Sequence, residues 1–134
     1  MINFWAVLLA AVANMIVGSL WYGPIFGKTW MGLTGMSTEQ LDSAKAKGMG
    51  KTYALAFVGA LVMGYVFARI IAMAGVGTTA GGAELGFWAW LGFVASVMLG
   101  EVLWEGKSSK LWFLESGYYL VVLLVMGAIL GGWR

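Results

Sequence analysis

Two acidic side chains lie inside long apolar stretches of this sequence. Glu101 and Glu115 each stand about one helical turn from the end of such a stretch. A charge at the centre of a bilayer costs about 2.5–3.5 kcal/mol on insertion scales, so an intramembrane ionisable residue is a default candidate for function. Two carboxylates at the same depth would share a proton, which suits cation binding or a proton relay. The alternative is structural pairing with Lys107 and Lys110.

Two further polar residues complete the candidate solute or ion site. Asn14 is the only strongly polar side chain near the middle of an apolar stretch. We expect it to hydrogen-bond between helices, with solute contact as the alternative. Arg69 lies about one turn inside another stretch. It could extend to the interface or meet Glu84.

Composition places these residues in a membrane. The chain has 134 residues, of which 61% are hydrophobic and 10% charged, and its mean hydropathy is +0.87. So few charges cannot cover a water-soluble surface of this size. The sequence has no His and no Cys, so we expect no metal, no cofactor and none of the common enzyme chemistries. A net charge of +2 beside apolar segments suits lipid headgroups rather than nucleic acid.

Four apolar stretches are long enough to cross a bilayer, which needs roughly 20 helical residues. They cover residues 2–22, 52–74, 86–104 and 111–132. Because lipid cannot satisfy backbone polar groups and no stretch alternates as a barrel strand does, helices are the expected structure. The sequence predicts an all-α membrane protein, a four-transmembrane-helix antiparallel bundle forming one domain over residues 1–134.

The distribution of basic residues predicts the orientation. Six lysines lie in the loops after the first and third spans, against only Arg69 and Arg134 on the other side. By the positive-inside rule, both termini lie outside the cytoplasm. Basic and aromatic residues near the inner interface are the expected contacts for lipid headgroups: Lys28, Lys45, Lys47, Lys51, Trp21 and Trp30.

The long first loop carries the signals of a short helix. Ser37 and Gln40 form a capping box, and Met36 and Leu41 a hydrophobic staple. Acidic residues in the first turn and lysines in the last complement the helix dipole before Gly48. We therefore expect an interfacial or cytoplasmic loop helix over residues 38–47.

The two halves of the chain show similar strings. The sequence LWYG at residues 20–23 resembles LWEG at 103–106, and LVMG at 61–64 recurs at 124–127. Two related helical hairpins would explain these matches. Chance is the alternative, because Leu, Val and Gly are abundant here.

Small residues at four-residue spacing predict how the helices pack, since lipid gives them no hydrophobic reason to associate. Such residues occur in the second, third and fourth spans: Ala56, Ala60, Gly64, Ala68, Gly92, Ser96, Gly100, Gly127 and Gly131. These faces would serve packing within the chain or a seam between identical subunits.

The run from Leu20 to Trp30, LWYGPIFGKTW, together with the helix start after it, resembles the bacterial membrane family known as domain of unknown function 1761. The strings EGK at 105–107, ESGYY at 115–119 and MGAILG at 126–131 also look like that family, so the resemblance covers nearly the whole chain. It implies a small multi-span protein of a bacterial cytoplasmic membrane, with no assigned activity.

Three functions remain open at this point. The first is a homo-oligomeric protein that interacts with lipids or a partner protein. The second is an oligomeric small-solute or ion transporter or channel that uses Glu101 and Glu115. The third, least supported by the residues, is a membrane enzyme using the same two carboxylates for acid–base work.

Overall fold

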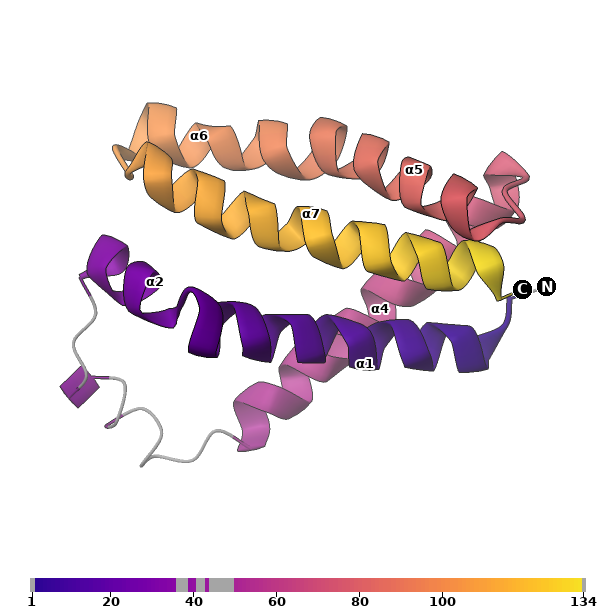
Figure 1. Cartoon of the computed structure of the whole chain (residues 1–134), viewed down its shortest axis with the longest axis horizontal. Helices are drawn as coiled ribbons and strands as arrows, with labels where there is room; N and C mark the ends of the chain where they lie inside the picture. Colours follow the sequence, from indigo (N-terminus) through magenta and orange to yellow (C-terminus); the bar gives the residue numbers. More distant parts are fainter. Residues whose placement is uncertain (1, 36–38, 41–42, 44–49, 134) are drawn as a thin grey trace.

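The computed structural model describes residues 2–35, 39–40, 43 and 50–133. These residues contain no strand, and four long helical segments run back and forth along the molecule (Figure 1). Each is long and apolar enough to cross a membrane: Phe4–Ile25, Gly50–Ala74, Thr79–Glu105 and Ser109–Gly132. The predicted all-α membrane protein with four transmembrane helices is therefore confirmed. Both termini lie at one end, here called the terminal end, and the opposite end is the loop end (Figure 1).

The first span bends near its loop end. Helix α1 (Phe4–Leu20) begins at Asn3, whose side-chain oxygen accepts hydrogen bonds from the backbone N–H groups of Trp5 and Ala6 at 3.1 and 3.2 Å. It continues into a wider π-helical turn, η1 (Trp21–Ile25), in which Gly23 leaves helical geometry just before the ring of Pro24. A second helix, α2 (Gly27–Thr34), follows this bend and packs against α7.

The second and third spans are joined by a tight turn. Helix α4 (Gly50–Ala74) ends at Gly75, whose φ of 73° favours glycine. The Thr78 hydroxyl then caps α5 (Thr79–Ala89) by accepting from the Gly81 N–H. The third span therefore starts before the predicted residue 86. It continues through a second π-helical segment, η2 (Trp90–Ala95), into α6 (Ser96–Glu105).

Helix α7 (Ser109–Gly132) is the central element and contacts α1, α2, α4, α5 and α6. Its approach to α5 is so close that backbone meets backbone. A Cβ atom at Gly82 would collide with the carbonyl of Gly127, and one at Gly127 would collide with the carbonyl of Gly82. Glycine at both positions is what permits α5 and α7 to lie this close.

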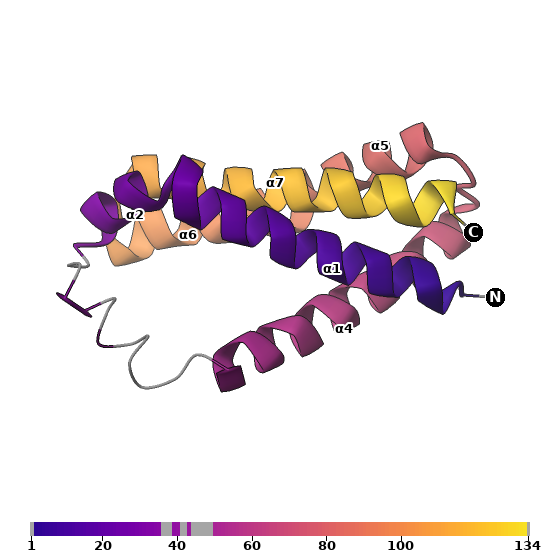
Figure 2. The ribbon, with the colours of Figure 1, turned by 60° about the horizontal axis from the view of Figure 1, so that its bottom comes forward.

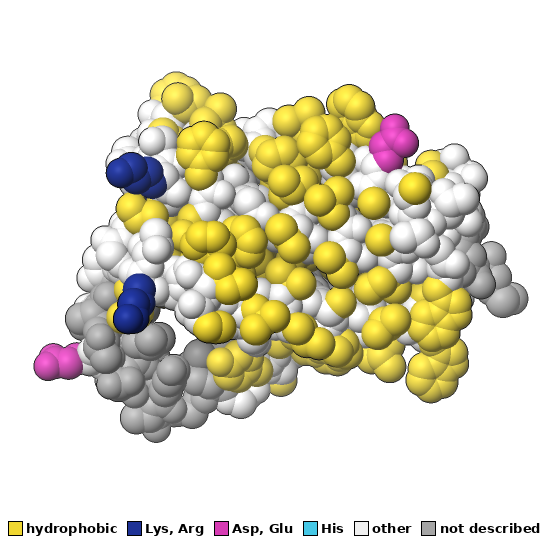
Figure 3. Space-filling model, in the orientation of Figure 1, with side chains coloured by type: hydrophobic (Ala, Val, Ile, Leu, Met, Phe, Trp, Pro, Cys, Tyr) yellow, Lys and Arg dark blue, Asp and Glu magenta, His cyan; other side chains and the backbone are white. Residues whose placement is uncertain are grey.

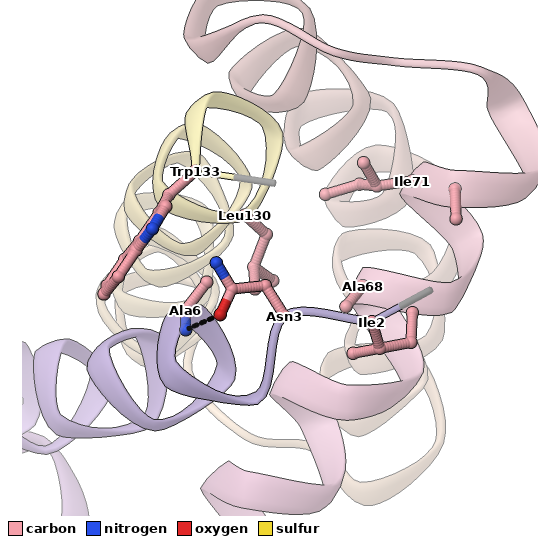
Figure 4. Close-up of a pocket in the computed structure, with 8 residues that line it drawn as sticks. Ile2, Asn3, Ala6, Ala68, Ile71, Leu130 and Trp133 are labelled. Atoms are coloured by element: carbon pink, nitrogen blue, oxygen red, sulfur yellow. Dashed lines mark hydrogen bonds between the residues drawn. The ribbon is translucent and has the colours of Figure 1, made fainter.

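The apolar core lies toward the terminal end, where α1, α4 and α7 meet. Its fully buried members include Ala10, Ile71, Val122 and Met126. A small cavity of about 20 Å³ lies there beside Asn3 and Leu130, with room for about one water molecule (Figure 4). Toward the loop end α4 diverges from the other helices, as two views show (Figures 1 and 2). The bundle is thus closed at one end and splayed at the other.

The surface is that of a protein surrounded by lipid. Hydrophobic side chains cover the middle of the molecule, and the charged side chains visible in this view lie toward its two ends (Figure 3). Large apolar residues such as Trp5, Met73 and Phe93 are 72%, 83% and 78% exposed. Apolar exposure on this scale is explained by a bilayer rather than by water.

Two predictions about the fold stay predictions. Most of the expected loop helix at 38–47 lies outside the described residues. The relation between the two halves is not tested either, although the halves pack differently: α4 splays from α1 at the loop end, whereas α6 and α7 run together there (Figure 1).

Candidate functional site

The splayed loop end contains a cavity of about 630 Å³ with Glu101 and Glu115 in its wall. We call it the carboxylate cavity. Six elements contribute to its lining: η1, α2, α4, η2, α6 and α7. Apart from the two glutamates, the lining side chains are aromatic, aliphatic or thioether: Tyr22, Trp30, Met63, Phe93, Val94, Val97, Met98, Glu101, Glu115 and Tyr119. The two acidic residues singled out from the sequence therefore face one space, from α6 and α7 respectively.

Helical spacing explains how α6 and α7 build this wall. Val94, Met98 and Glu101 follow one another at intervals of four and three residues, so they share one face of the third span. Glu115 and Tyr119 are four residues apart on α7 and share a face in the same way. Each carboxylate thus lies at the loop end of a stripe that continues toward mid-depth.

Glu115 is held by the short helix that follows the first span. The indole N–H of Trp30 on α2 donates a hydrogen bond to Glu115 Oε1 at 3.4 Å. The ring of Tyr22 packs edge-on against Trp30, with ring centroids 5.8 Å apart. The bend at Gly23 makes this contact possible, because it turns α2 back against α7.

Glu101 has a cation beside it, as the structural alternative expected. Lys107 Nζ lies 3.9 Å from Glu101 Oε1 and 3.7 Å from Glu105 Oε2. All three side chains are at least one-third exposed, so this arrangement contributes little stability. In the described part of the chain no Lys or Arg forms an ion pair with Glu115. The two carboxylates are therefore not equivalent.

Asn14 makes contacts between helices at mid-depth. Its Oδ1 accepts a hydrogen bond from the Tyr118 hydroxyl at 2.8 Å. Its Nδ2 donates toward the sulfur atoms of Met63 and Met126 at 3.6 and 3.9 Å. Asn14 thereby joins α1 to α4 and α7.

A second hollow, of about 440 Å³, lies on the other side of Tyr22 and Trp30, between α1 and α4. Tyr118 lines this hollow, whereas Met63 lines the carboxylate cavity. Asn14 bonds to both residues, so it links the walls of the two spaces.

Arg69 is not part of this site. It lies toward the terminal end of α4, where its Nη1 donates to the hydroxyl of Tyr65 at 3.1 Å and its guanidinium lies 5.8 Å from the centre of the same ring. Arg69 thus pairs with a residue of its own helix, where the sequence suggested Glu84 as a partner. The structure does not bring it near Glu101 or Glu115.

The predicted headgroup contacts fall into three groups. Lys28 and Lys51 are exposed near the loop end, and Lys45 and Lys47 lie outside the described residues. The indoles of Trp21 and Trp30 are half-buried, and they donate to the Leu114 carbonyl at 3.1 Å and to Glu115. These two N–H groups are therefore engaged within the chain and are not free to bind headgroups.

The small residues also divide. Ala60, Gly64 and Ala68 are buried, and so are Gly127 and Gly131, whereas Ala56 is exposed. Gly92 has open space around it, and the Ser96 hydroxyl bonds back to the Gly92 carbonyl, so the 92–96–100 face does not pack within the chain. Gly82 and Gly86 take that place instead, because they meet the backbone of α7 at Gly127 and Leu123.

The sequence did not lead us to predict the tyrosines of the site. Tyr22, Tyr118 and Tyr119 line one hollow or both, and their rings form a connected series with centroids 4.9–5.2 Å apart. One signal was readable: Tyr118 and Tyr119 follow Glu115 by three and four residues, which places them on its side of the helix.

In the described residues no group of three or more His, Asp or Glu side chains is placed to hold a metal ion.

No curated protein and no solved structure matches the chain. The family model described as "Protein of unknown function (DUF1761)" matches residues 5–131, nearly the whole length. The chain, with its four apolar helices, therefore belongs to the DUF1761 family.

Proposed function

We propose that this protein binds a small cationic solute in the carboxylate cavity and passes it through the membrane. The observation that carries the proposal is the placement of Glu101 and Glu115 in the wall of one cavity at membrane depth. A charged carboxylate within a membrane span is energetically costly, so its presence there indicates a functional role, and a cation is the partner that would offset its charge. The cavity volume of about 630 Å³ lies within the usual range for small-molecule sites.

The backbone at this cavity supports the proposal. Both π-helical segments contribute to its wall, η1 through Tyr22 and η2 through Phe93 and Val94. Single π-helical turns occur frequently at functional sites, where they re-aim side chains that a regular helix would direct elsewhere. One such turn, η2, and the kink at Gly23 in η1 meet at this cavity, which favours a binding role over simple packing.

Uptake by proteoliposomes tests this function. We expect a cation-dependent current or uptake that falls at least tenfold when Glu115 is replaced by Gln, because the amide keeps the shape and removes the charge. Glu101→Gln should have a smaller effect, since Lys107 already offsets that charge. Glu84→Gln is the matched control: Glu84 is an exposed glutamate on α5 that does not line the cavity. An uptake or current that is unchanged in the Glu115→Gln variant would contradict the proposal.

The proposal includes a homo-oligomer in contact with lipids. Four helices of this length hardly enclose a water-filled path alone, and the outward face at Gly92, Ser96 and Gly100 offers a smooth surface for a second copy. A single-cysteine variant, Ser96→Cys, should form a disulfide-linked dimer in membranes, whereas Val66→Cys on the exposed side of α4 should not. Equal cross-linking of the two variants would argue against this seam.

The proposed location is the bacterial cytoplasmic membrane with both termini outside the cytoplasm. Because the chain has no cysteine, single-cysteine variants report topology directly. Ser109→Cys at the loop end should react with an impermeant maleimide only after the cytoplasmic face is opened, and Ala80→Cys at the terminal end should react in intact cells. The reverse pattern would invert the orientation.

A further inference from the structure

We infer that the cation bound in the carboxylate cavity is an organic ammonium ion with apolar substituents, with Glu115 as its counter-charge and the rings of Trp30, Tyr22 and Tyr119 as its cage. This inference rests on the proposed function and names the class of solute. Its support comes from the donor set, the volume, the ring arrangement and the position of the cavity mouth.

The donor set does not suit a calcium or magnesium ion. Calcium and magnesium ions take about six or more oxygen ligands. The side chains of this cavity offer two carboxylates and the hydroxyls of Tyr22 and Tyr119, and one oxygen of Glu115 already accepts from Trp30. The remaining lining is aromatic, aliphatic or thioether. Such a wall solvates a diffuse organic cation better than a bare metal ion.

Three rings line the cavity, those of Tyr22, Trp30 and Tyr119, and the ring of Tyr118 links Tyr22 to Tyr119. Tyr22 meets Trp30 edge-on, with planes 75° apart, and meets Tyr118 at 62°. Tyr118 in turn contacts Tyr119, whose ring lines the carboxylate cavity. Aromatic faces set at steep angles around one space are the usual means of binding alkylated ammonium groups.

Glu115 is the carboxylate that a bound cation would reach. Trp30 holds it by one oxygen, and no cationic side chain in the described residues pairs with it. Glu101 lies at the same cavity but has Lys107 at 3.9 Å. Charge recognition is therefore concentrated beside the Trp30 ring, where electrostatic and cation–π attraction act on the same group.

The mouth of the cavity opens toward lipid. Phe93 and Val97 line the cavity and are 78% and 70% exposed on the surface of the third span. An ammonium ion with apolar substituents partitions into the bilayer and can arrive through this side.

Equilibrium binding of radiolabelled benzyltrimethylammonium to the full chain in dodecyl maltoside, a detergent without an ammonium group, tests the inference. We expect saturable binding that is weakened at least tenfold by Glu115→Gln and about tenfold by Trp30→Leu, because one desolvated ring–cation contact is lost. Trp30→Phe, which keeps a ring but removes the N–H donor, should lose less than Trp30→Leu. The matched controls are Trp104→Leu, at an indole that is 88% exposed outside the cavity, and Glu84→Gln.

Tyr119→Leu and Tyr119→Phe provide the same comparison if Trp30→Leu does not fold. Lysophosphatidylcholine added as a competitor separates two sources of the ammonium group: displacement points to a lipid headgroup, and its absence to a free solute. Both results support the inference.

Three results would overturn it in distinguishable ways. If sodium or potassium binds in a Glu115-dependent manner while benzyltrimethylammonium does not, the solute class is wrong and the cation-binding function stands. If Glu115→Gln weakens benzyltrimethylammonium binding but Trp30→Leu and Tyr119→Leu leave it unchanged, the rings form no cage. If no cation binds in a Glu115-dependent manner, the inference and the proposed function fail together.

Discussion

Replacing Gly82 with Ala should destabilise the protein by about 3 kcal/mol or more, because the new methyl group has nowhere to go. Its Cβ would overlap the carbonyl carbon and oxygen of Gly127, which belong to the backbone of α7 and cannot rotate aside. The two helices must then separate along much of their shared length. Unfolding in mixed micelles at increasing dodecyl sulfate, followed by circular dichroism, measures the change.

Two other glycines provide graded controls for this prediction. A Cβ at Gly64 would find Met126 Cε and Val7 Cγ1 at 3.4 Å, an ordinary contact, so Gly64→Ala should cost less than about 1 kcal/mol. Gly92 has open space, and Ala favours the helix there, so Gly92→Ala should be neutral or slightly stabilising. If all three variants unfolded alike, the close approach of α5 and α7 would be disproved.

Replacing Asn14 with Leu should destabilise the fold by about 1–2 kcal/mol, although it makes the interior more apolar. The Tyr118 hydroxyl loses its acceptor at 2.8 Å, and an unpaired hydroxyl inside a membrane protein costs more than the added apolar contact returns. The same unfolding experiment measures the loss.

A double-mutant cycle isolates the bond between these two side chains. Tyr118→Phe alone should cost about 1 kcal/mol, and the double variant should be no less stable than Asn14→Leu, because the second change removes the orphaned hydroxyl. Ser19→Ala, where the exposed hydroxyl bonds only to Met15 of its own helix, is the neutral control. Strictly additive losses would show that the Asn14–Tyr118 bond contributes nothing.

The transmembrane helices could be predicted from the sequence because lipid leaves the backbone no other way to satisfy its polar groups. Their ends were harder to place. Gly81 and Gly82 look like part of a loop, yet both belong to α5, and α7 lies against Gly82. Helix α2 was missed because its eight residues follow Pro24 and mix aromatics with a single lysine. In both places a tertiary contact outweighs local sequence preference.

The candidate site was predictable only for its charges. Glu101 and Glu115 stand out because a carboxylate in an apolar stretch is rare, and the short turn between their helices fixes their common depth. The aromatic partners do not stand out, since Trp and Tyr are expected at any membrane interface. Only the bend at Gly23 brings Trp30 to Glu115, across 85 positions of sequence. No local pattern encodes that contact.

The divergence of α4 gives the protein unequal cross-sections in the two leaflets of the bilayer (Figures 1 and 2). At the terminal end the helices occupy a small area, and at the loop end they occupy a larger one. A wedge of this kind relieves lateral pressure unevenly, so the molecule should be enriched where the membrane is curved with the leaflet around the loop end on its convex side.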